Sequence, residues 1–349
     1  MTEAKGAVRG RLAIVDIIKA AACIMIYLYH CNTILPGEWK FLTFLGQDLG
    51  NNLFFMVSGF SLAPSIDRID MKKDGMRAAC RWYLKRLLRI LPITVIAYIL
   101  TFFMGYYSLD DPKQLIAIFI YPTLYWFITA ILVFYIILFL AAKCPYRSIM
   151  YIMCAMLAIL YVVLYSGQER LYVIGLLSML SGYLLKEHIE KKENALTGEA
   201  YGSRHGVLLS LIASVLLFIV FIMGKRADRG YFSAILIMTG VLGTGLSLLT
   251  CGYMANDRLT AFFEKRHRLY GLLRYIGDMA LPVYLVQCFC FGYIGFTIGL
   301  HVDFPLSFPV NLIIVWTLGT LLYIINRIIN NSLLFAVIKL FSVDNGCGD

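Results

Sequence analysis

Long apolar runs separated by short polar segments dominate the chain. A helix of about 20 apolar residues crosses the roughly 30 Å hydrocarbon core of a bilayer. Ten runs approach that length: 13–31, 45–65, 88–107, 123–142, 148–166, 171–186, 206–224, 231–250, 276–297 and 309–328. The fourth and sixth have the least defined limits, because 112–142 is one apolar stretch and the sixth run is short. The pattern predicts an all-α polytopic transmembrane bundle of about ten spans.

Polar segments are too short to form a separate soluble domain. We therefore expect one transmembrane domain over 13–330, between an N-terminal segment (1–12) and a C-terminal tail (331–349). The polar segment 186–205 is predicted to be a cytoplasmic linker, and the basic segment 253–275 is a candidate interfacial helix. The first run contains Asp16 and Lys19 and lacks a small-residue cleavage site, so we expect a retained anchor rather than a signal peptide.

Basic residues gather on one side of the predicted spans. With a cytoplasmic N-terminus, inside segments hold 24 of the 31 Lys and Arg residues, outer loops hold 6, and Lys19 lies in the first run. The positive-inside rule then predicts that both termini are cytoplasmic. The net charge of +10 would face anionic headgroups or an anionic ligand. Nucleic-acid binding is disfavoured, because the charges flank spans and no recognition module is visible.

Three ionisable residues share one side of the first predicted span. At about 100° per residue, Asp16, Lys19 and His30 fall within an arc of roughly 60°. Ionisable groups inside a bilayer are costly and usually functional. His30 is the only histidine in a predicted span, and histidine is the side chain whose unperturbed pKa lies nearest neutral pH. This pattern indicates a proton-transfer site in a membrane enzyme, with an interface histidine bonded to a carbonyl as the alternative.

A second cluster precedes the third predicted span. Positions 77, 81, 85, 86 and 89 are basic and lead into Ile90-Leu91-Pro92. Helical spacing places them on one face, and guanidinium groups bind phosphate oxygens bidentately. The cluster predicts a site for a phosphorylated cofactor. An ordinary positive-inside flank that contacts lipid headgroups is the alternative.

Three motifs resemble those of the acyltransferase type 3 membrane family. They are Val15-Asp16-Ile17-Ile18-Lys19-Ala20-Ala21-Ala22 with Tyr29-His30, Asn52-Leu53-Phe54-Phe55-Met56-Val57-Ser58-Gly59-Phe60, and Tyr83 to Pro92 with its Arg86 and Arg89 pair. Their order and spacing match the family. Tyr125-Trp126-Phe127-Ile128 and Leu281-Pro282-Val283-Tyr284-Leu285 resemble weaker features of later helices.

The resemblance implies an acyl-CoA-dependent O-acyltransferase of the bacterial cytoplasmic (inner) membrane. Such enzymes move an acyl group, commonly acetyl, from cytoplasmic acyl-CoA to a hydroxyl of a cell-envelope polysaccharide or lipid-linked glycan. We expect no metal, because the nine cysteines lack metal-site spacing. The resemblance assigns His30 to catalysis and Arg86 and Arg89 to acyl-CoA. Lys19, where many members carry arginine, is a further candidate for cofactor binding. Gln287 stands where a histidine is frequent, so no second histidine role is carried over.

The axial spacing of residues along the first span predicts how the acyl group of acyl-CoA reaches His30. At 1.5 Å per residue, Asp16 lies about 21 Å and Lys19 about 17 Å from His30, too far for a hydrogen bond. We expect these two residues to pair with each other or to line a passage. Through that passage the pantetheine arm of acyl-CoA would reach His30 from arginines at the inner surface.

The second and fourth predicted spans add secondary candidates. Asn52 and Ser58 lie on one helix, where Ser58 acts as a nucleophile only beside a base, and Ser-Gly pairs often serve close packing. Trp126 is a further candidate, although Tyr125 and Trp126 are also typical of interface anchors. The rival function is a transporter or flippase, for which paired repeats are expected and not seen. A glycan polymerase is a second rival, but the predicted outer loops are short.

Overall fold

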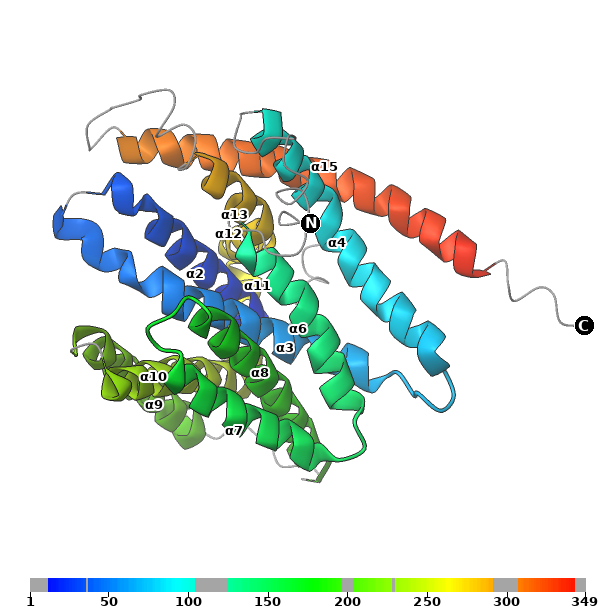
Figure 1. The fold of residues 1–349 in the computed structure, drawn as a ribbon, viewed down its shortest axis with the longest axis horizontal. Helices are drawn as coiled ribbons and strands as arrows, with labels where there is room; N and C mark the ends of the chain where they lie inside the picture. Colours follow the sequence, from blue (N-terminus) through cyan, green and yellow to red (C-terminus); the bar gives the residue numbers. More distant parts are fainter. Residues whose placement is uncertain are drawn as a thin grey trace, which may run out of the picture. The chain divides into compact units, whose positions relative to one another are not determined.

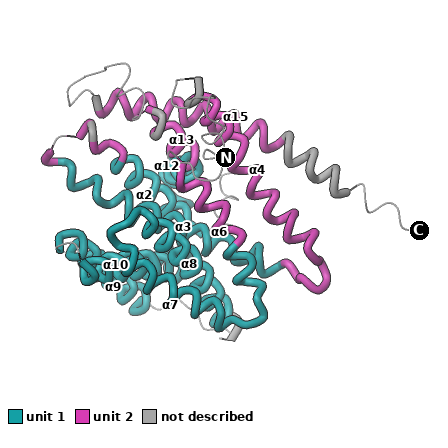
Figure 2. The backbone as a smooth tube through the Cα atoms, viewed as in Figure 1, with its two compact units in different colours: residues 1–29, 39–68, 137–280 teal, residues 30–38, 69–136, 281–349 magenta. Residues whose placement is uncertain are grey.

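The described residues of the computed structural model are helical and contain no strand (Figure 1). They comprise residues 12–35, 37–103, 125–195, 204–227, 230–290 and 307–342. The chain divides into two compact units that alternate along the sequence (Figure 2). Unit 1 comprises residues 1–29, 39–68 and 137–280, and unit 2 comprises residues 30–38, 69–136 and 281–349. The predicted all-α fold is confirmed over the described part.

Unit 1 contains most of the long helices. A π-helical turn, η3 (Gly46–Gly50), leads directly into the second long helix. The helices are α2 (Ala13–His30, whose last residue belongs to unit 2), α3 (Asn51–Asp67), α7 (Arg147–Val163), α8 (Arg170–Ala195), α9 (Arg204–Arg226), α10 (Tyr231–Met254), α11 (Asn256–Lys265) and α12 (His267–Asp278). The candidate interfacial segment 253–275 is therefore helical, as α11 and α12 with the end of α10.

Helices α3 and α8 approach each other through paired glycines. A Cβ atom on Gly59 would lie 1.9 Å from the carbonyl oxygen of Met179, and one on Gly182 would lie 2.0 Å from the carbonyl oxygen of Met56. Any larger residue at either position would force the helices apart. Small residues permit this close packing where helix association cannot rely on the hydrophobic effect. This contact holds α3 against α8 within unit 1.

Unit 2 consists of fewer helices. They are α4 (Gly75–Phe103), the first part of α6 (Trp126–Lys143), α13 (Ala280–Phe289, from Leu281 on) and α15 (Ser307–Ser342). Helices α4 and α15 pack against each other, and Asn326 Nδ2 donates a 3.4 Å hydrogen bond to the carbonyl oxygen of Arg89. Tyr125 is 0% exposed and donates to the carbonyl oxygen of Leu285 at 3.3 Å. Interpreting Tyr125 as an interface anchor is therefore wrong.

Several of the predicted spans coincide with helices suited to a membrane. In the described part, five helices are long and apolar enough to cross a bilayer: α2, α6, α9, α10 and α15 over Phe308–Asn331. The ten-span count and the cytoplasmic termini stay predictions. Residues 104–107, 123–124 and 291–297 of the predicted spans lie outside the described residues.

The polar linker predicted over 186–205 begins later than expected. Helix α8 continues to Ala195, so residues 186–195 are helical. Charged pairs one turn apart support this extension: Lys186 pairs with Glu190 at 3.1 Å, and Lys191 pairs with Glu187 at 2.5 Å. Such pairs stabilise a helical segment that is rich in charged residues, and its low hydropathy explains why the predicted span ended at 186.

Candidate functional site

His30 is the last residue of the uninterrupted helix α2. Its side chain is half-buried, and a short 3-10 helix, Cys31–Thr33, follows it. Because α2 is continuous, Asp16 lies about 21 Å along the axis from His30 and cannot orient its imidazole. His30 belongs to unit 2, together with Arg86, Arg89 and Trp126, whereas Asp16, Lys19, Asn52 and Ser58 belong to unit 1.

Asp16 has a partner that the sequence did not reveal. Its side chain is 2% exposed, and its Oδ2 accepts a 2.7 Å hydrogen bond from the hydroxyl of Tyr270 on α12. Gly277 of the same helix is close enough that a Cβ would lie 3.2 Å from Cβ of Lys19. Helix α12 therefore covers the beginning of α2, where Asp16 and Lys19 lie. A buried carboxylate needs such hydrogen bonds.

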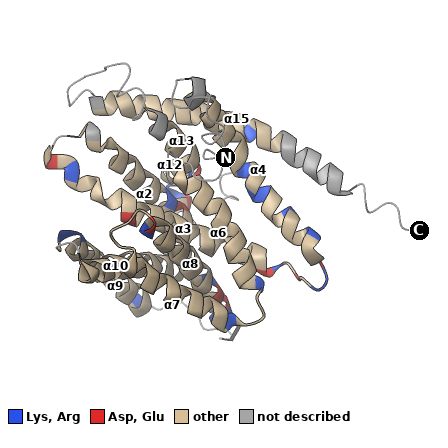
Figure 3. Cartoon of the chain, viewed as in Figure 1, with Lys and Arg blue, Asp and Glu red and all other residues tan. Residues whose placement is uncertain are grey.

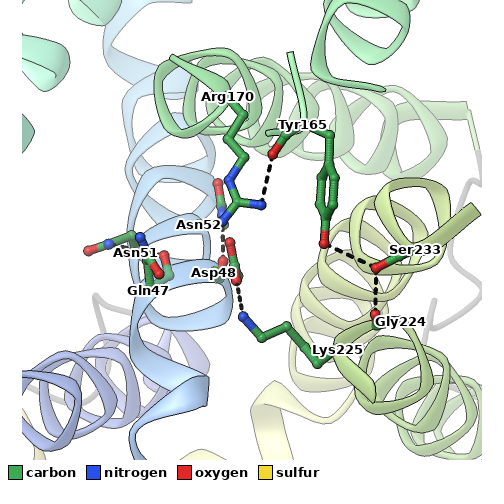
Figure 4. A network of polar contacts seen from close by, with 9 residues as sticks. All are labelled: Gln47, Asp48, Asn51, Asn52, Tyr165, Arg170, Gly224, Lys225 and Ser233. Carbon is green, nitrogen blue, oxygen red and sulfur yellow. Dashed lines mark hydrogen bonds and ion pairs between the residues drawn. The ribbon is translucent and has the colours of Figure 1, made fainter. Parts of the chain in front are cut away.

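Asn52 belongs to a buried polar network rather than standing alone. It is 1% exposed, its Nδ2 donates to the carbonyl oxygen of Asp48, and its Oδ1 accepts a 3.0 Å hydrogen bond from Ser178 on α8. The carboxylate of Asp48 in turn pairs with Lys225 of α9 at 2.7 Å (Figure 4). The network joins η3 and α3 to α8 and α9, and buried networks of this kind fix one arrangement of helices.

Ser58 directs its hydroxyl toward its own helix. The Oγ donates to the carbonyl oxygen of Phe54 at 2.8 Å, a local bond that serine commonly makes inside helices. Ser58 also precedes Gly59, which provides the close contact with α8. The geometry supports the packing alternative for Ser58, because its proton is not directed at a base.

Arg86 and Arg89 occupy different environments on α4. Arg86 is half-buried, its guanidinium lies 3.9 Å from the centroid of the Trp82 ring, and its Nη1 donates to the carbonyl oxygen of Trp82 at 2.8 Å. Arg89 is exposed. Burial lowers the pKa of Arg86 to about 10, so it stays protonated at neutral pH. Arg86 is thus held in one orientation by Trp82, beside a row of basic residues along α4 (Figure 3).

Trp126 begins helix α6 and contacts another aromatic residue. It is half-buried and meets the Phe127 ring edge-on, with centroids 6.0 Å apart. Phe127 and the preceding Tyr125 both pack against Tyr284 of α13, at 5.5 and 6.2 Å. The two segments that carry the weaker family motifs therefore meet within unit 2. Trp126 therefore lies beside an aromatic cluster, and its candidate role in the site stays a prediction.

Gln287 received no role from the sequence, but its side chain has an unusual environment in the structure. It is 0% exposed on α13, and neither Nε2 nor Oε1 has a hydrogen-bond partner in the described part of the chain. An unsatisfied buried amide costs about 1–3 kcal/mol, and such exceptions often mark functional positions. Gln287 is therefore a candidate for contact with a bound substrate in unit 2.

Replacing Gln287 with methionine should separate stability from activity. Methionine matches the shape without the unsatisfied amide, so we expect Gln287→Met to raise the melting temperature in detergent by about 1–3 °C. If Gln287 hydrogen-bonds the substrate, acyl transfer should fall at least about tenfold in this variant. The buried Leu285→Met variant on the same helix is the control and should change neither quantity much. Unaltered transfer in Gln287→Met would remove Gln287 from the site.

No group of three or more His, Cys, Asp or Glu side chains suited to a metal occurs among the described residues.

The model of a family described as an acyltransferase domain matches residues 12–326 of the chain. Neither a search of curated proteins nor a search of solved structures gives a match. The family match spans α2, α3 and α4, which carry the three N-terminal motifs.

Proposed function

Because the chain belongs to the acyltransferase type 3 family, we propose that it transfers an acyl group from cytoplasmic acyl-CoA to a glycan hydroxyl. The acceptor would be a polysaccharide or lipid-linked glycan of the bacterial cell envelope, and the acyl group would be acetyl. Several apolar helices make the chain an integral membrane protein. We place it in the bacterial cytoplasmic membrane. The family match over 12–326 carries the proposal.

His30 is the proposed general base. The acceptor hydroxyl gives its proton to the imidazole while its oxygen attacks the thioester carbonyl carbon. The resulting tetrahedral oxyanion collapses, the carbon–sulfur bond breaks, and the proton passes from His30 to the departing CoA thiolate. The half-buried position of His30 at the end of α2 supports this role, because it leaves the imidazole partly accessible.

Arg86 and Arg89 are the proposed binding residues for the CoA phosphates. The Trp82 ring holds the Arg86 guanidinium at 3.9 Å, and a side chain that is already ordered loses less entropy when it binds. Arg89 is exposed and free to follow a flexible phosphate. Under the predicted orientation these arginines lie at the inner surface and His30 in the outer half. The pantetheine arm would then span the distance between them.

Purified protein in lipid nanodiscs tests the proposal directly. With acetyl-CoA labelled in the acetyl group and a membrane glycan fraction as acceptor, we expect release of free CoA and hydroxylamine-labile label on the glycan. The label measures ester formation, and CoA release measures use of the donor. Movement of glycan across a vesicle membrane without consumption of acetyl-CoA would identify a flippase instead.

Thiol labelling tests the predicted orientation. Glu38 is exposed in the 3-10 helix Gly37–Leu42, and Lys192 is exposed near the end of α8. In a variant without the nine native cysteines, Glu38→Cys should react with an impermeant reagent from outside, and Lys192→Cys only after the membrane is opened. Labelling from the same side would show an error in the span count between them. A reversed pattern would place the arginines away from cytoplasmic acyl-CoA.

A further inference from the structure

A cavity of about 650 Å³ lies within unit 1, where the turns that join two helix pairs meet. Its walls come from the α7–α8 turn, including Tyr165 and Gln168, from the ends of α9 and α10 at Lys225 and Tyr231, and from Gln47 of η3. Sites for small ligands commonly have volumes of about 300–1,000 Å³. In the predicted orientation these turns face the outside of the cell.

Among the described residues, the charged side chains that line the cavity are both basic. Arg170 and Lys225 are its ionised lining residues, and no Asp or Glu lines it within the described part. Lys225 is engaged by the buried Asp48 at 2.7 Å, so that pair is close to neutral. Arg170 donates one hydrogen bond, from Nη1 to the carbonyl oxygen of Tyr165 at 3.1 Å. A guanidinium has five N–H donors, so the walls favour an anionic group near Arg170.

Tyr165 and its contacts hold Arg170 in position. The Arg170 guanidinium lies 4.9 Å from the centroid of the Tyr165 ring. The Tyr165 hydroxyl is 3.0 Å from Ser233 Oγ, and Ser233 donates to the carbonyl oxygen of Gly224 at 2.7 Å. Figure 4 shows Arg170 and Lys225 pointing toward Asp48 from two different helices. A cation that is held in advance loses less entropy when it binds.

The other lining groups suit a hydroxyl-rich ligand. Gln47, Ser166 and Gln168 provide hydrogen-bond donors and acceptors on the walls. Tyr231, 70% exposed, presents an aromatic ring at the cavity. The apolar lining is limited to two valines, an alanine and glycines, which offers little surface to two acyl chains of a lipid. The combination favours a saccharide that carries a negative charge.

Tyr29 connects the polar network to the proposed catalytic residue, because it lies near the network and is adjacent to His30 in the sequence. A Cβ atom on Gly46 of η3 would lie 2.4 Å from Cβ of Tyr29, so Tyr29 lies directly beside the turn that carries Gln47 and Asp48. Tyr29 is also the residue directly before His30. We infer that the cavity binds a carboxylate- or phosphate-bearing sugar of the acceptor glycan, with Arg170 as the anion-binding residue. This inference rests on the proposed function, since it identifies the class of acceptor.

Direct binding to the full chain tests the inference without acyl transfer. The probes are a hyaluronan tetrasaccharide, which carries carboxylates, and neutral chitotetraose, with glucose 1-phosphate and glucose as the phosphate arm. In phosphatidylcholine nanodiscs, we expect at least one anionic probe to bind about tenfold more tightly than its neutral counterpart, as a charge-assisted hydrogen bond allows. Preferred binding of the hyaluronan tetrasaccharide identifies a carboxylate as the recognised anion, and preferred binding of glucose 1-phosphate identifies a phosphate.

Variants of two arginines distinguish binding at Arg170 from a non-specific effect of positive charge near the cavity. Arg170→Ala should abolish the preference for the anionic probe, and Arg170→Lys should retain part of it. Arg226 is exposed, lies one residue beyond Lys225 and does not line the cavity, so Arg226→Ala should leave the preference intact. Acetyl-CoA binding should be unchanged in all three. If the unaltered protein does not consume acetyl-CoA, the proposed function is contradicted. The measured affinities for the saccharides do not depend on that result.

Several results would overturn the inference. They are equal affinity for charged and neutral probes, no binding of any probe, or the same loss in Arg226→Ala as in Arg170→Ala. Stabilisation by phosphatidylglycerol nanodiscs that depends on Arg170, without an effect of the saccharides, would identify a lipid headgroup as the ligand instead.

Discussion

Replacing His30 with alanine should abolish acyl transfer and leave the protein folded and inserted. A positioned general base contributes about a hundred- to ten-thousandfold to rate, so the transfer rate should fall at least about a hundredfold. The fold should survive, because His30 is the last residue of α2 and is only half-buried. The measurement is incorporation of labelled acetyl into glycan, at matched protein abundance in the membrane.

Two further variants show whether the lost imidazole is the cause. His188 is an exposed histidine of α8, and His188→Ala should retain full activity. His30→Gln keeps a hydrogen-bonding group but cannot accept the proton, so it should be nearly as inactive as His30→Ala. Acetyl-CoA affinity should be unchanged in both His30 variants. Near-normal acylation in His30→Ala would make His30 an interface histidine with a structural role.

The paired variant Arg86→Ala/Arg89→Ala should lose most of its affinity for acyl-CoA. A hydrogen bond to a charged group contributes about 1.5–3 kcal/mol, so each single change should weaken binding roughly tenfold or more, and the pair roughly a hundredfold or more. Lysine should rescue Arg86 poorly, because an ammonium group can neither fork to phosphate nor stack on Trp82 as a guanidinium does. Calorimetric titration of the detergent-solubilised protein with acetyl-CoA measures the effect.

Lys85 provides the matched control for charge. It is exposed on the same helix, one turn before Arg89, and Lys85→Ala removes one positive charge as each arginine variant does. We expect it to change affinity less than twofold at about 0.15 M salt, where exposed charges are screened. Equal effects of Lys85→Ala and Arg86→Ala, or unchanged affinity in the paired variant, would favour an ordinary positive-inside flank.

Hydropathy predicted where helices form, because the bilayer dictates the length of an apolar run. The run 13–31 became α2, and 206–224 and 231–250 became α9 and α10. It ended one helix too early, because α8 extends through charged residues to Ala195. The aromatic motif at Tyr125 suggested the membrane interface, but burial against α13 contradicts this for Tyr125.

The sequence by itself determined the class of fold and the family, and it identified the candidate residues for the proposed chemistry. Local order is enough for these, since His30 and the arginine pair are recognisable from motifs and from their positions along helices. The tertiary structure alone decided how Asp16 is satisfied, because its partner Tyr270 lies 254 positions away. It likewise decided that Asp48 pairs with Lys225, 177 positions away, beside the cavity that contains Arg170. Periodicity along a chain reports which face of a helix is polar, whereas the choice of partner depends on which helices pack together.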